Sequence, residues 1–227
     1  MGKANRLNRP RVTLTYTQSL DGSIAAQRGE PLGISGQESL RMTHQLRAQH
    51  DAILVGIGTI LADDPQLTVR LVEGENPQPV VLDSRLRFPL NARLLGNARP
   101  PWIVTSFDAV TTQNASEDHL EVLESKGVKI LTVPQSPDGR IDLPAMLNDL
   151  FESGIETLMV EGGAQVITAF LRENLVDQVI ITIAPVFVGG LRAVETILSS
   201  NDHFPRLDSV KIEPYGLDWV ITGKFKP

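Results

Sequence analysis

The amino-acid sequence predicts an α/β domain with a mostly parallel central sheet, flanking helices and an antiparallel hairpin at its C-terminal end. Apolar runs of strand length recur along the chain, and most are continuous, as in strands that are covered on both faces. Helical segments lie between several of these runs, which is the alternation that builds parallel sheets. The chain then ends differently, in two strand-like runs around the turn "PYGLD".

The expected strands and helices follow one another at short intervals. We expect strands over residues 12–16, 52–55, 80–82, 102–104, 128–133, 157–160 and 179–186, and the hairpin over 210–213 and 219–225. We expect helices over 37–49, 114–126, 143–153 and 164–174. Ser35 and Glu38 have the spacing of a capping box for the first helix, and Gly127 and Gly154 follow the second and third as stop signals.

Composition limits the class of protein. The 227 residues are 41% hydrophobic and 21% charged, which fits one domain over 1–227 with residues 1–10 as a flexible tail. The net charge of −6 argues against a nucleic-acid partner, and no segment is apolar enough for a signal or membrane span. There is no cysteine and the four histidines are scattered, so we expect a cytoplasmic protein without a metal site.

The stretch "LVGIGTILADDPQLTVR", residues 54–70, begins like a dinucleotide-binding turn but has Leu61 where a third small residue belongs. Pro65 allows only one or two helical turns after Gly58 before an extended exit. Thr59 and Asp63, four residues apart, would share one face of that helix and could hydrogen-bond a ribose or an amide. The alternative is that the acidic residues only cap and solvate a turn.

A second candidate site is "LMVEGGAQVITAFL", residues 158–171, where a strand runs into a glycine pair and an amphipathic helix. Gly162 and Gly163 would let a phosphate approach the amides at the helix N-terminus. Glu161 would lie at the carboxyl end of the strand, where open α/β sheets bind their ligands. A purely structural turn is the alternative.

Three weaker signals accompany these two. In "VVLDSRLRFP", Ser84 and Arg85 follow a strand and together suit a phosphate monoester, unless Asp83 merely caps a turn there. The turn in "TQSLDGSIA" could border a pocket. Arg47 and Arg70 flank the central loop and could bind an anionic substrate, although solvated arginines are commoner.

Read in order, "TLTYTQSLDGSIA", "MTHQLRAQHDAILVGIGTILADDPQLTVR", "PVVLDSRLRFPLNARLL", "LMVEGGAQVITAFL" and "VDQVIITIAPVFVGG" resemble the pyrimidine reductase family of riboflavin biosynthesis. The resemblance covers nearly the whole chain, and the block 42–70 is more specific than any glycine pattern. It implies a dihydrofolate-reductase-like fold, NADPH as the cofactor and a homodimer. It also implies hydride transfer to C1′ of a ribosylaminopyrimidine 5′-phosphate, which opens the sugar to a ribityl chain.

The same resemblance assigns roles to individual residues. Arg47, Leu67, Arg70 and Glu161 would line the substrate site, and Glu161 and Asp63 are the candidates for handling a proton. The residues implied to hold NADPH are Thr17, Thr59, Asp63, Ser84 and the segment 163–169, which begins with Gly163, Ala164, Gln165, Val166 and Ile167.

Two departures from the family's bacterial pattern matter. Pro31 and Gly33 in "GEPLGIS" stand where the bifunctional bacterial proteins carry Ser and Trp, so contacts expected there are not carried over. The zinc deaminase part is also absent, and the fungal and archaeal type is the nearer match. We therefore expect the diamino substrate. The alternatives are the deaminated intermediate, another pterin or pyrimidine as substrate, and a nucleotide-binding protein without turnover.

Overall fold

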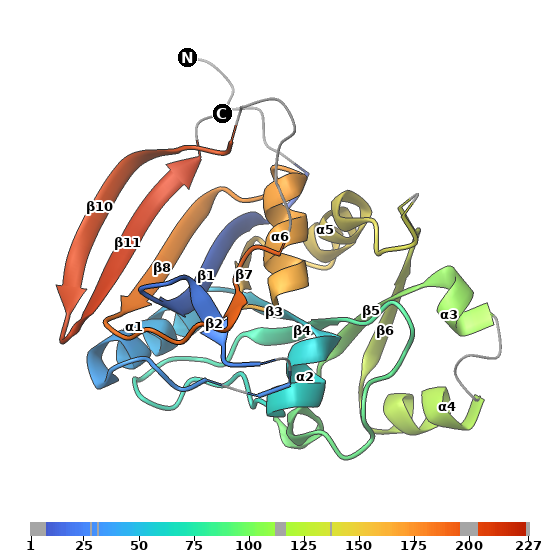
Figure 1. Ribbon diagram of the computed structural model, residues 1–227. Coiled ribbons are helices and arrows are strands. Elements are labelled where there is room, and N and C mark those ends of the chain that lie inside the picture. The colour runs from blue at the N-terminus through green and yellow to red at the C-terminus, as the bar shows by residue number, and fades with distance from the viewer. Residues whose placement is uncertain are drawn as a thin grey trace.

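In the computed structural model, one nine-stranded sheet runs through the molecule (Figure 1). The structure describes residues 8–225 except 28, 31, 112–116, 137 and 196–203. The strand order is β10-β11-β8-β1-β7-β3-β4-β5-β6. In chain order these strands are β1 (Arg11–Ser19), β3 (Ala52–Gly56), β4 (Gln78–Leu82), β5 (Trp102–Ser106), β6 (Lys129–Val133), β7 (Thr157–Val160), β8 (Gln178–Ala184), β10 (Leu207–Tyr215) and β11 (Asp218–Phe225).

The predicted mostly parallel sheet is confirmed. The seven strands from β8 to β6 are parallel to one another, and antiparallel pairing in this sheet occurs only between β8 and β11 and between β11 and β10. The C-terminal hairpin is therefore confirmed, although its strands are longer than expected and leave only Gly216 and Leu217 for the turn. A separate two-stranded sheet pairs β2 (Ser23–Ala25) with β9 (Leu191–Arg192), and sequence patterning did not predict it.

Most of the helices also lie where the sequence predicts them. They are α1 (Gln37–Ala48), α2 (Ile57–Asp63), α3 (Phe107–Thr111), α4 (Glu117–Ser125), α5 (Leu143–Glu152) and α6 (Ala164–Arg172), with a 3₁₀ turn η1 at Arg93–Gly96. The helix expected over 114–126 is described from residue 117 onward, since 112–116 lie outside the described residues. The short helix α3 was not predicted.

The sheet separates two apolar layers because successive strand residues point to opposite faces. Ala52 and Leu54 of β3 pack with α5 and α6 on one face, whereas Ile53 and Val55 pack with α2, α4 and η1 on the other. All four of these residues are fully buried, as the continuous apolar run predicts. Every helix in the described part of the chain is too short or too polar to cross a membrane.

The predicted capping box at Ser35 and Glu38 is wrong. Gly36 is the N-cap of α1, and a remote side chain takes the role: Asp218 accepts hydrogen bonds from the Gly36 N–H, at 2.7 Å, and from the Ser39 hydroxyl. Ser35 instead shares a hydrogen bond with Thr17, at 2.9 Å between their hydroxyl oxygens. The N-terminus of α1 is therefore held by a contact with β11 and not by the local capping pattern.

The expected N-terminal tail is only partly described. Residues 1–7 lie outside the described residues. Beyond them, the Arg9 guanidinium donates two hydrogen bonds of 2.8 Å to the Asp177 carboxylate, which also accepts the Val12 N–H at 2.7 Å. This contact ties the chain to the amino-terminal ends of β1 and β8.

Candidate active site

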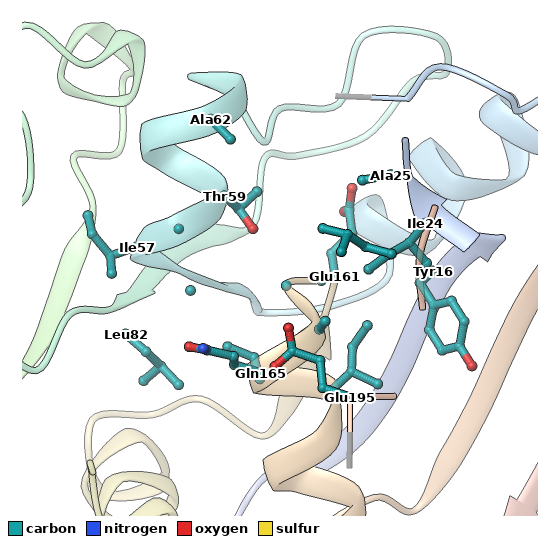
Figure 2. Close-up of a pocket in the computed structure, with 18 of the residues that line it drawn as sticks. Tyr16, Ile24, Ala25, Ile57, Thr59, Ala62, Leu82, Glu161, Gln165 and Glu195 are labelled. Atoms are coloured by element: carbon teal, nitrogen blue, oxygen red, sulfur yellow. The ribbon is translucent and has the colours of Figure 1, made fainter. Parts of the chain in front are cut away.

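A cavity of about 620 Å³ opens where β1, β7, β3 and β4 end (Figure 2). Its volume lies within the range usual for small-molecule sites. The carboxyl ends of these parallel strands share one edge of the sheet, so the segments that follow them meet there. The cavity is lined by the predicted residues Thr17, Thr59, Asp63, Ser84, Glu161, Gly162, Gly163, Ala164, Gln165, Val166 and Ile167.

The helix α2 has the form predicted for the central loop. It is seven residues long, begins after Gly56 and ends at Asp63, and its C-cap is Asp64, which has a left-handed φ of 40° directly before Pro65. Thr59 and Asp63 both face the cavity. Burial raises the pKa of the Asp63 carboxyl above its usual value. Asp64 has a different role, because its carboxylate accepts the Arg93 N–H at 2.8 Å.

The glycine pair after β7 leaves bare backbone at the cavity. Gly162 and Gly163 have φ of 133° and 86°, values that other residues rarely adopt. A Cβ on Gly162 would meet no atom within 4 Å. Within the part of the chain that the structure describes, no side chain caps the helix α6 that begins here, and its first protein-bonded amide is that of Ile167, which donates to the Gly163 carbonyl. The earlier amides can therefore bind an anion.

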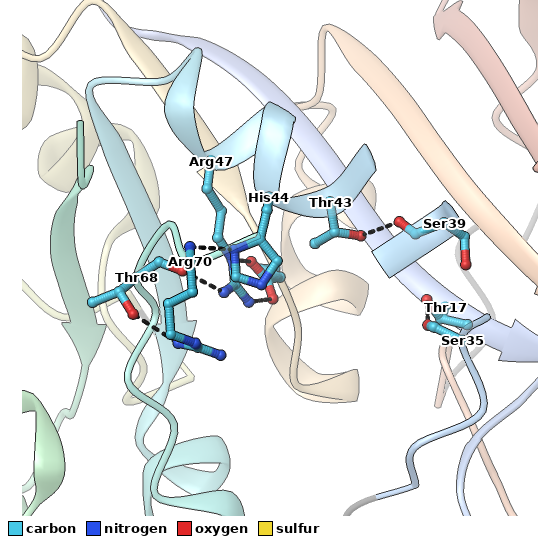
Figure 3. Close-up of polar contacts among 9 residues, drawn as sticks. Thr17, Ser35, Ser39, Thr43, His44, Arg47, Thr68 and Arg70 are labelled. Carbon is cyan, nitrogen blue, oxygen red and sulfur yellow. Dashed lines mark hydrogen bonds and ion pairs between the residues drawn. The ribbon is translucent and has the colours of Figure 1, made fainter. Parts of the chain in front are cut away.

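Glu161 is held in a double ion pair. Arg47 on α1 donates from Nε to Glu161 Oε2, at 2.8 Å, and from Nη2 to Oε1 (Figure 3). Its third nitrogen donates to the Thr68 carbonyl at 3.1 Å. Although burial opposes the charge, Glu161 raises the pKa of Arg47 above its usual value. Arg47 lies behind Glu161 and is not among the residues that line the cavity.

His44, which sequence reasoning missed, belongs to the same cluster. It is 2% exposed, and its Nδ1 accepts the Arg70 N–H at 3.0 Å, so that nitrogen carries no proton. Burial, followed by the charges of Arg47 and Arg70, lowers the pKa of His44 to about 4. Figure 3 shows His44, Arg47, Thr68 and Arg70 converging between α1 and the chain that follows α2.

Two of the predicted substrate residues lie beside this cluster. The Arg70 guanidinium donates to the Thr68 hydroxyl at 2.7 Å, and the residue is exposed. Leu67 is 3% exposed, has a φ of 52°, and packs in the α2 layer of the core. Neither residue is among those that line the cavity.

After β4, Arg87 rather than the predicted Arg85 is among the residues that line the cavity. Ser84 lines the cavity, but Arg85 is exposed and outside the lining, whereas Arg87 belongs to it. Leu86 has a φ of 50°, and this turn separates the two arginines. Arg87 Nε lies 3.5 Å from the buried carboxylate of Asp83. Spacing alone could not tell which arginine turns inward.

The remaining wall comes from segments with weak sequence signals. Ser35, Thr43 and Gly33 line the cavity, as do Ile24 and Ala25 of β2. The segment "GEPLGIS", which differs from the family's bacterial pattern, therefore lies at the site. Its Pro31 is outside the described residues. Among the residues with described positions, no three His, Asp or Glu side chains gather to hold a metal ion.

The chain is similar to known proteins over nearly its whole length. The chain is 38% identical over 227 residues to the 2,5-diamino-6-ribosylamino-4(3H)-pyrimidinone 5′-phosphate reductase of Archaeoglobus fulgidus, covering 96% of this chain and 99% of that protein. The riboflavin biosynthesis reductase Rib7 of Saccharomyces cerevisiae superposes with a TM-score of 0.77 at 29% identity, over 99% of this chain and 93% of Rib7.

The fold class is confirmed by a more distant structure. Dihydrofolate reductase from Enterococcus faecalis superposes with a TM-score of 0.52 at 13% identity, over 96% of this chain and 97% of that enzyme, so the fold is dihydrofolate-reductase-like. The model of the RibD C-terminal domain family matches residues 10–221. The chain therefore belongs to the RibD C-terminal domain family, the pyrimidine reductases that its sequence motifs resemble.

Proposed function

We propose that this protein is an NADPH-dependent reductase of riboflavin biosynthesis that converts a ribosylaminopyrimidine 5′-phosphate to its ribitylamino form. One observation carries the proposal: the cavity joins an uncapped helix N-terminus with bare glycine backbone to a carboxylate held by a buried arginine. The first part suits a dinucleotide phosphate, and the second suits a polar substrate. The 38% identity to a named reductase over nearly the full chain supports this assignment.

The residues at the cavity fit the dinucleotide. The open space beside Gly162 and the amides that begin α6 suit the pyrophosphate. Thr17, Thr59 and Asp63 offer hydrogen-bonding groups for ribose and amide. Ser84 and Arg87 are a hydroxyl and a guanidinium on the same cavity, the pair that suits the 2′-phosphate by which NADPH differs from NADH.

We assign the pyrimidine substrate to the Glu161 side of the cavity. Arg47 holds the Glu161 carboxylate in one orientation, so the carboxylate is not free to rotate. Arg70 lies beside this pair with an exposed guanidinium, which suits the substrate's 5′-phosphate. Leu67 would support this wall from the core rather than touch the substrate, since it is 3% exposed.

The reaction needs both alignment and a proton. NADPH, when bound, would supply the hydride for the new bond at C1′; the C1′–O4′ bond would break and O4′ would gain a proton. Asp63 is the better donor of the two candidates, because it faces the cavity and partial desolvation of its carboxyl raises its pKa, even though the residue is exposed to solvent. Glu161 is less suited to donate, because both of its oxygens accept hydrogen bonds from Arg47. We therefore assign Glu161 to substrate positioning.

We assign the diamino compound as the preferred substrate. The support is that the archaeal relative, similar over nearly the whole of both chains, is named as the reductase of that compound.

We also propose a cytoplasmic location. A chain that has no cysteine and uses NADPH fits the reducing cytoplasm.

We further propose a homodimer through the hairpin edge. Ile212 and Trp219 are 58% and 50% exposed, and their strand partners Ile221 and Ile183 point to the same face. Among the described helices, α1 packs against the opposite face, and none covers this one (Figure 1). An uncovered apolar face of this kind is typical of a protein interface.

Purified protein tests the proposal directly. NADPH oxidation should be followed with the diamino compound, with its deaminated product and with dihydrofolate as separate substrates. We expect turnover of the diamino compound at the highest kcat/KM. Turnover of dihydrofolate alone would show a different reductase, and tight NADPH binding without turnover of any of them would contradict the enzymatic assignment.

A further inference from the structure

Asp21 is the centre of a closed hydrogen-bond network between two distant segments. Its Oδ1 accepts from the Ser19 hydroxyl, at 2.6 Å, and from the Val188 N–H, at 2.9 Å. Its Oδ2 accepts from the Ser23 hydroxyl and the Gly189 N–H, both at 2.8 Å. Each carboxylate oxygen therefore receives one hydroxyl and one backbone amide, which satisfies the carboxylate on both sides.

The two serines extend this network. The Ser19 hydroxyl accepts the Ser23 N–H, and the Ser23 hydroxyl accepts the Gly190 N–H, each at 2.9 Å. Three successive amides, those of residues 188–190, thus point at this group of side chains. Backbone amides in such a row favour a negative charge between them. The hydrogen bonds, that from Ser19 first, lower the pKa of Asp21 well below its usual range.

This network fixes a wall of the cavity. β2 begins at Ser23 and pairs antiparallel with β9, which begins directly after Gly190. A Cβ on Gly190 would overlap the Ala25 carbonyl, so the two backbones approach too closely here for any side chain at residue 190. Ile24, Ala25 and Leu191 line the cavity. Figure 2 shows Ile24 and Ala25 on the side of the cavity where Glu161 lies.

We propose that Asp21 is a positioning residue for the reaction, because its carboxylate holds the β2–β9 wall against the Glu161 side of the cavity. Asp21 itself is not among the residues that line the cavity. It acts through Ile24 and Ala25, which would exclude water from the pyrimidine and keep it aligned. The proposal rests on the assignment of the Glu161 side to the pyrimidine substrate.

Asp21→Asn is the informative change because it keeps the shape but replaces one acceptor oxygen with an NH₂ group. In either orientation the NH₂ group faces a backbone N–H, of Val188 or of Gly189, and cannot accept from it. The loop at residues 188–190 therefore loses one of the hydrogen bonds that hold it to the segment before β2. Asp177→Asn is the matched control, since Asp177 also binds a backbone N–H and lies at the opposite ends of β1 and β8.

The first measurement is hydrogen–deuterium exchange on the protein without ligands. Asp21→Asn should speed exchange in residues 19–25 and 185–193 and leave the rest of the chain as in the wild type. Asp177→Asn should not affect these segments. Unchanged exchange in both segments in Asp21→Asn would overturn the proposal, and this result does not depend on the identity of the substrate.

The second measurement is steady-state kinetics with NADPH and the diamino compound. Asp21→Asn should raise KM for the pyrimidine about tenfold, the loss expected for a hydrogen bond to a charged group, and change KM for NADPH less than twofold. Asp177→Asn should match the wild type in both. Equal changes for the two reactants, or equal behaviour of both variants, would overturn the positioning role. A wild type without turnover would instead refute the proposed function, and the exchange data would still test the wall.

Discussion

Arg47 and Glu161 are 114 positions apart in the sequence and meet in a two-bond ion pair at the wall of the cavity, with Glu161 in the lining and Arg47 behind it. Their side chains are 10% and 18% exposed, so water screens this pair less than a surface pair. The guanidinium matches both carboxylate oxygens, and its remaining nitrogen binds the Thr68 carbonyl. The pair thereby joins α1, the end of β7 and the chain after α2 at one point.

Replacing Arg47 with Lys should show whether the ion pair depends on the positive charge alone or also on the two parallel hydrogen bonds to Glu161. Lysine keeps the positive charge but cannot make the two parallel bonds, so Glu161 would be free to rotate. We expect kcat/KM for the pyrimidine to fall at least tenfold, with little change in the NADPH dissociation constant. Arg47→Ala should also unfold more easily, by about 3 kcal/mol, because it leaves a buried charge unpaired. Steady-state kinetics and urea unfolding measure both effects, and a weaker NADPH affinity in Arg47→Lys would contradict this assignment.

The sequence predicts the sheet well because its signal is local. A strand that is buried on both faces needs a continuous apolar run, and β3 has one. The short helix α2 was also predictable, since Pro65 limits its length whatever surrounds it. These features depend on residues within a few positions of one another.

Contacts between distant segments were not predictable in the same way. The cap of α1 comes from Asp218, which is 182 positions from Gly36, so the pattern at Ser35 was misleading. His44 gave no signal because its partner is a backbone N–H from residue 70. The carboxylate of Asp21 likewise binds amides more than 160 positions away. Sequence spacing does not encode such contacts, since only the completed sheet brings the segments together.

Arg87 rather than Arg85 should determine the preference for NADPH over NADH. Arg87 lines the cavity with Ser84, whereas Arg85 points elsewhere. Arg87→Ala should weaken NADPH binding about tenfold or more and leave NADH binding nearly unchanged, since only NADPH carries the 2′-phosphate. Arg85→Ala is the matched control and should behave as the wild type. An equal loss for both cofactors, or a larger effect of Arg85→Ala, would reject this role.

Gly56 should not tolerate a side chain because a Cβ there would overlap Val166, and shortening Val166 should relieve the overlap. A Cβ there would lie 2.9 Å from Val166 Cγ2, at the start of α6. Gly56→Ala should destabilise the protein by about 1–3 kcal/mol through overpacking, and Val166→Ala should restore much of this loss. Gly58→Ala, whose Cβ meets no atom within 4 Å, should not destabilise it. Urea unfolding of the four variants tests this, and additive losses in the double variant would contradict the steric explanation.

A charge on the uncovered hairpin face should break the proposed dimer. Trp219 is half exposed and lies opposite Pro214 in the hairpin. Trp219→Glu would place a carboxylate in an apolar interface, which costs several kcal/mol unless it is paired. We expect a monomer in sedimentation velocity where the wild type is a dimer. Leu71→Glu, at a residue 40% exposed on a loop, should leave the dimer intact. A dimeric Trp219→Glu variant would place the interface elsewhere.

His44 should make stability depend on pH. Folding lowers its pKa from the usual 6.5 to about 4, so between these values the unfolded chain binds a proton that the folded chain does not. The stabilisation is therefore fully present above about pH 6.5 and is lost as the pH falls toward 4. His44→Gln keeps an acceptor for the Arg70 N–H but cannot titrate, so its free energy of unfolding should fall less over this interval. Burial also lowers the pKa of His50, but this contribution is common to both proteins and cancels in the comparison. Urea unfolding at pH 7, 5.5 and 4.5 should show the two curves converging in acid, and parallel curves would mean that His44 does not titrate with folding.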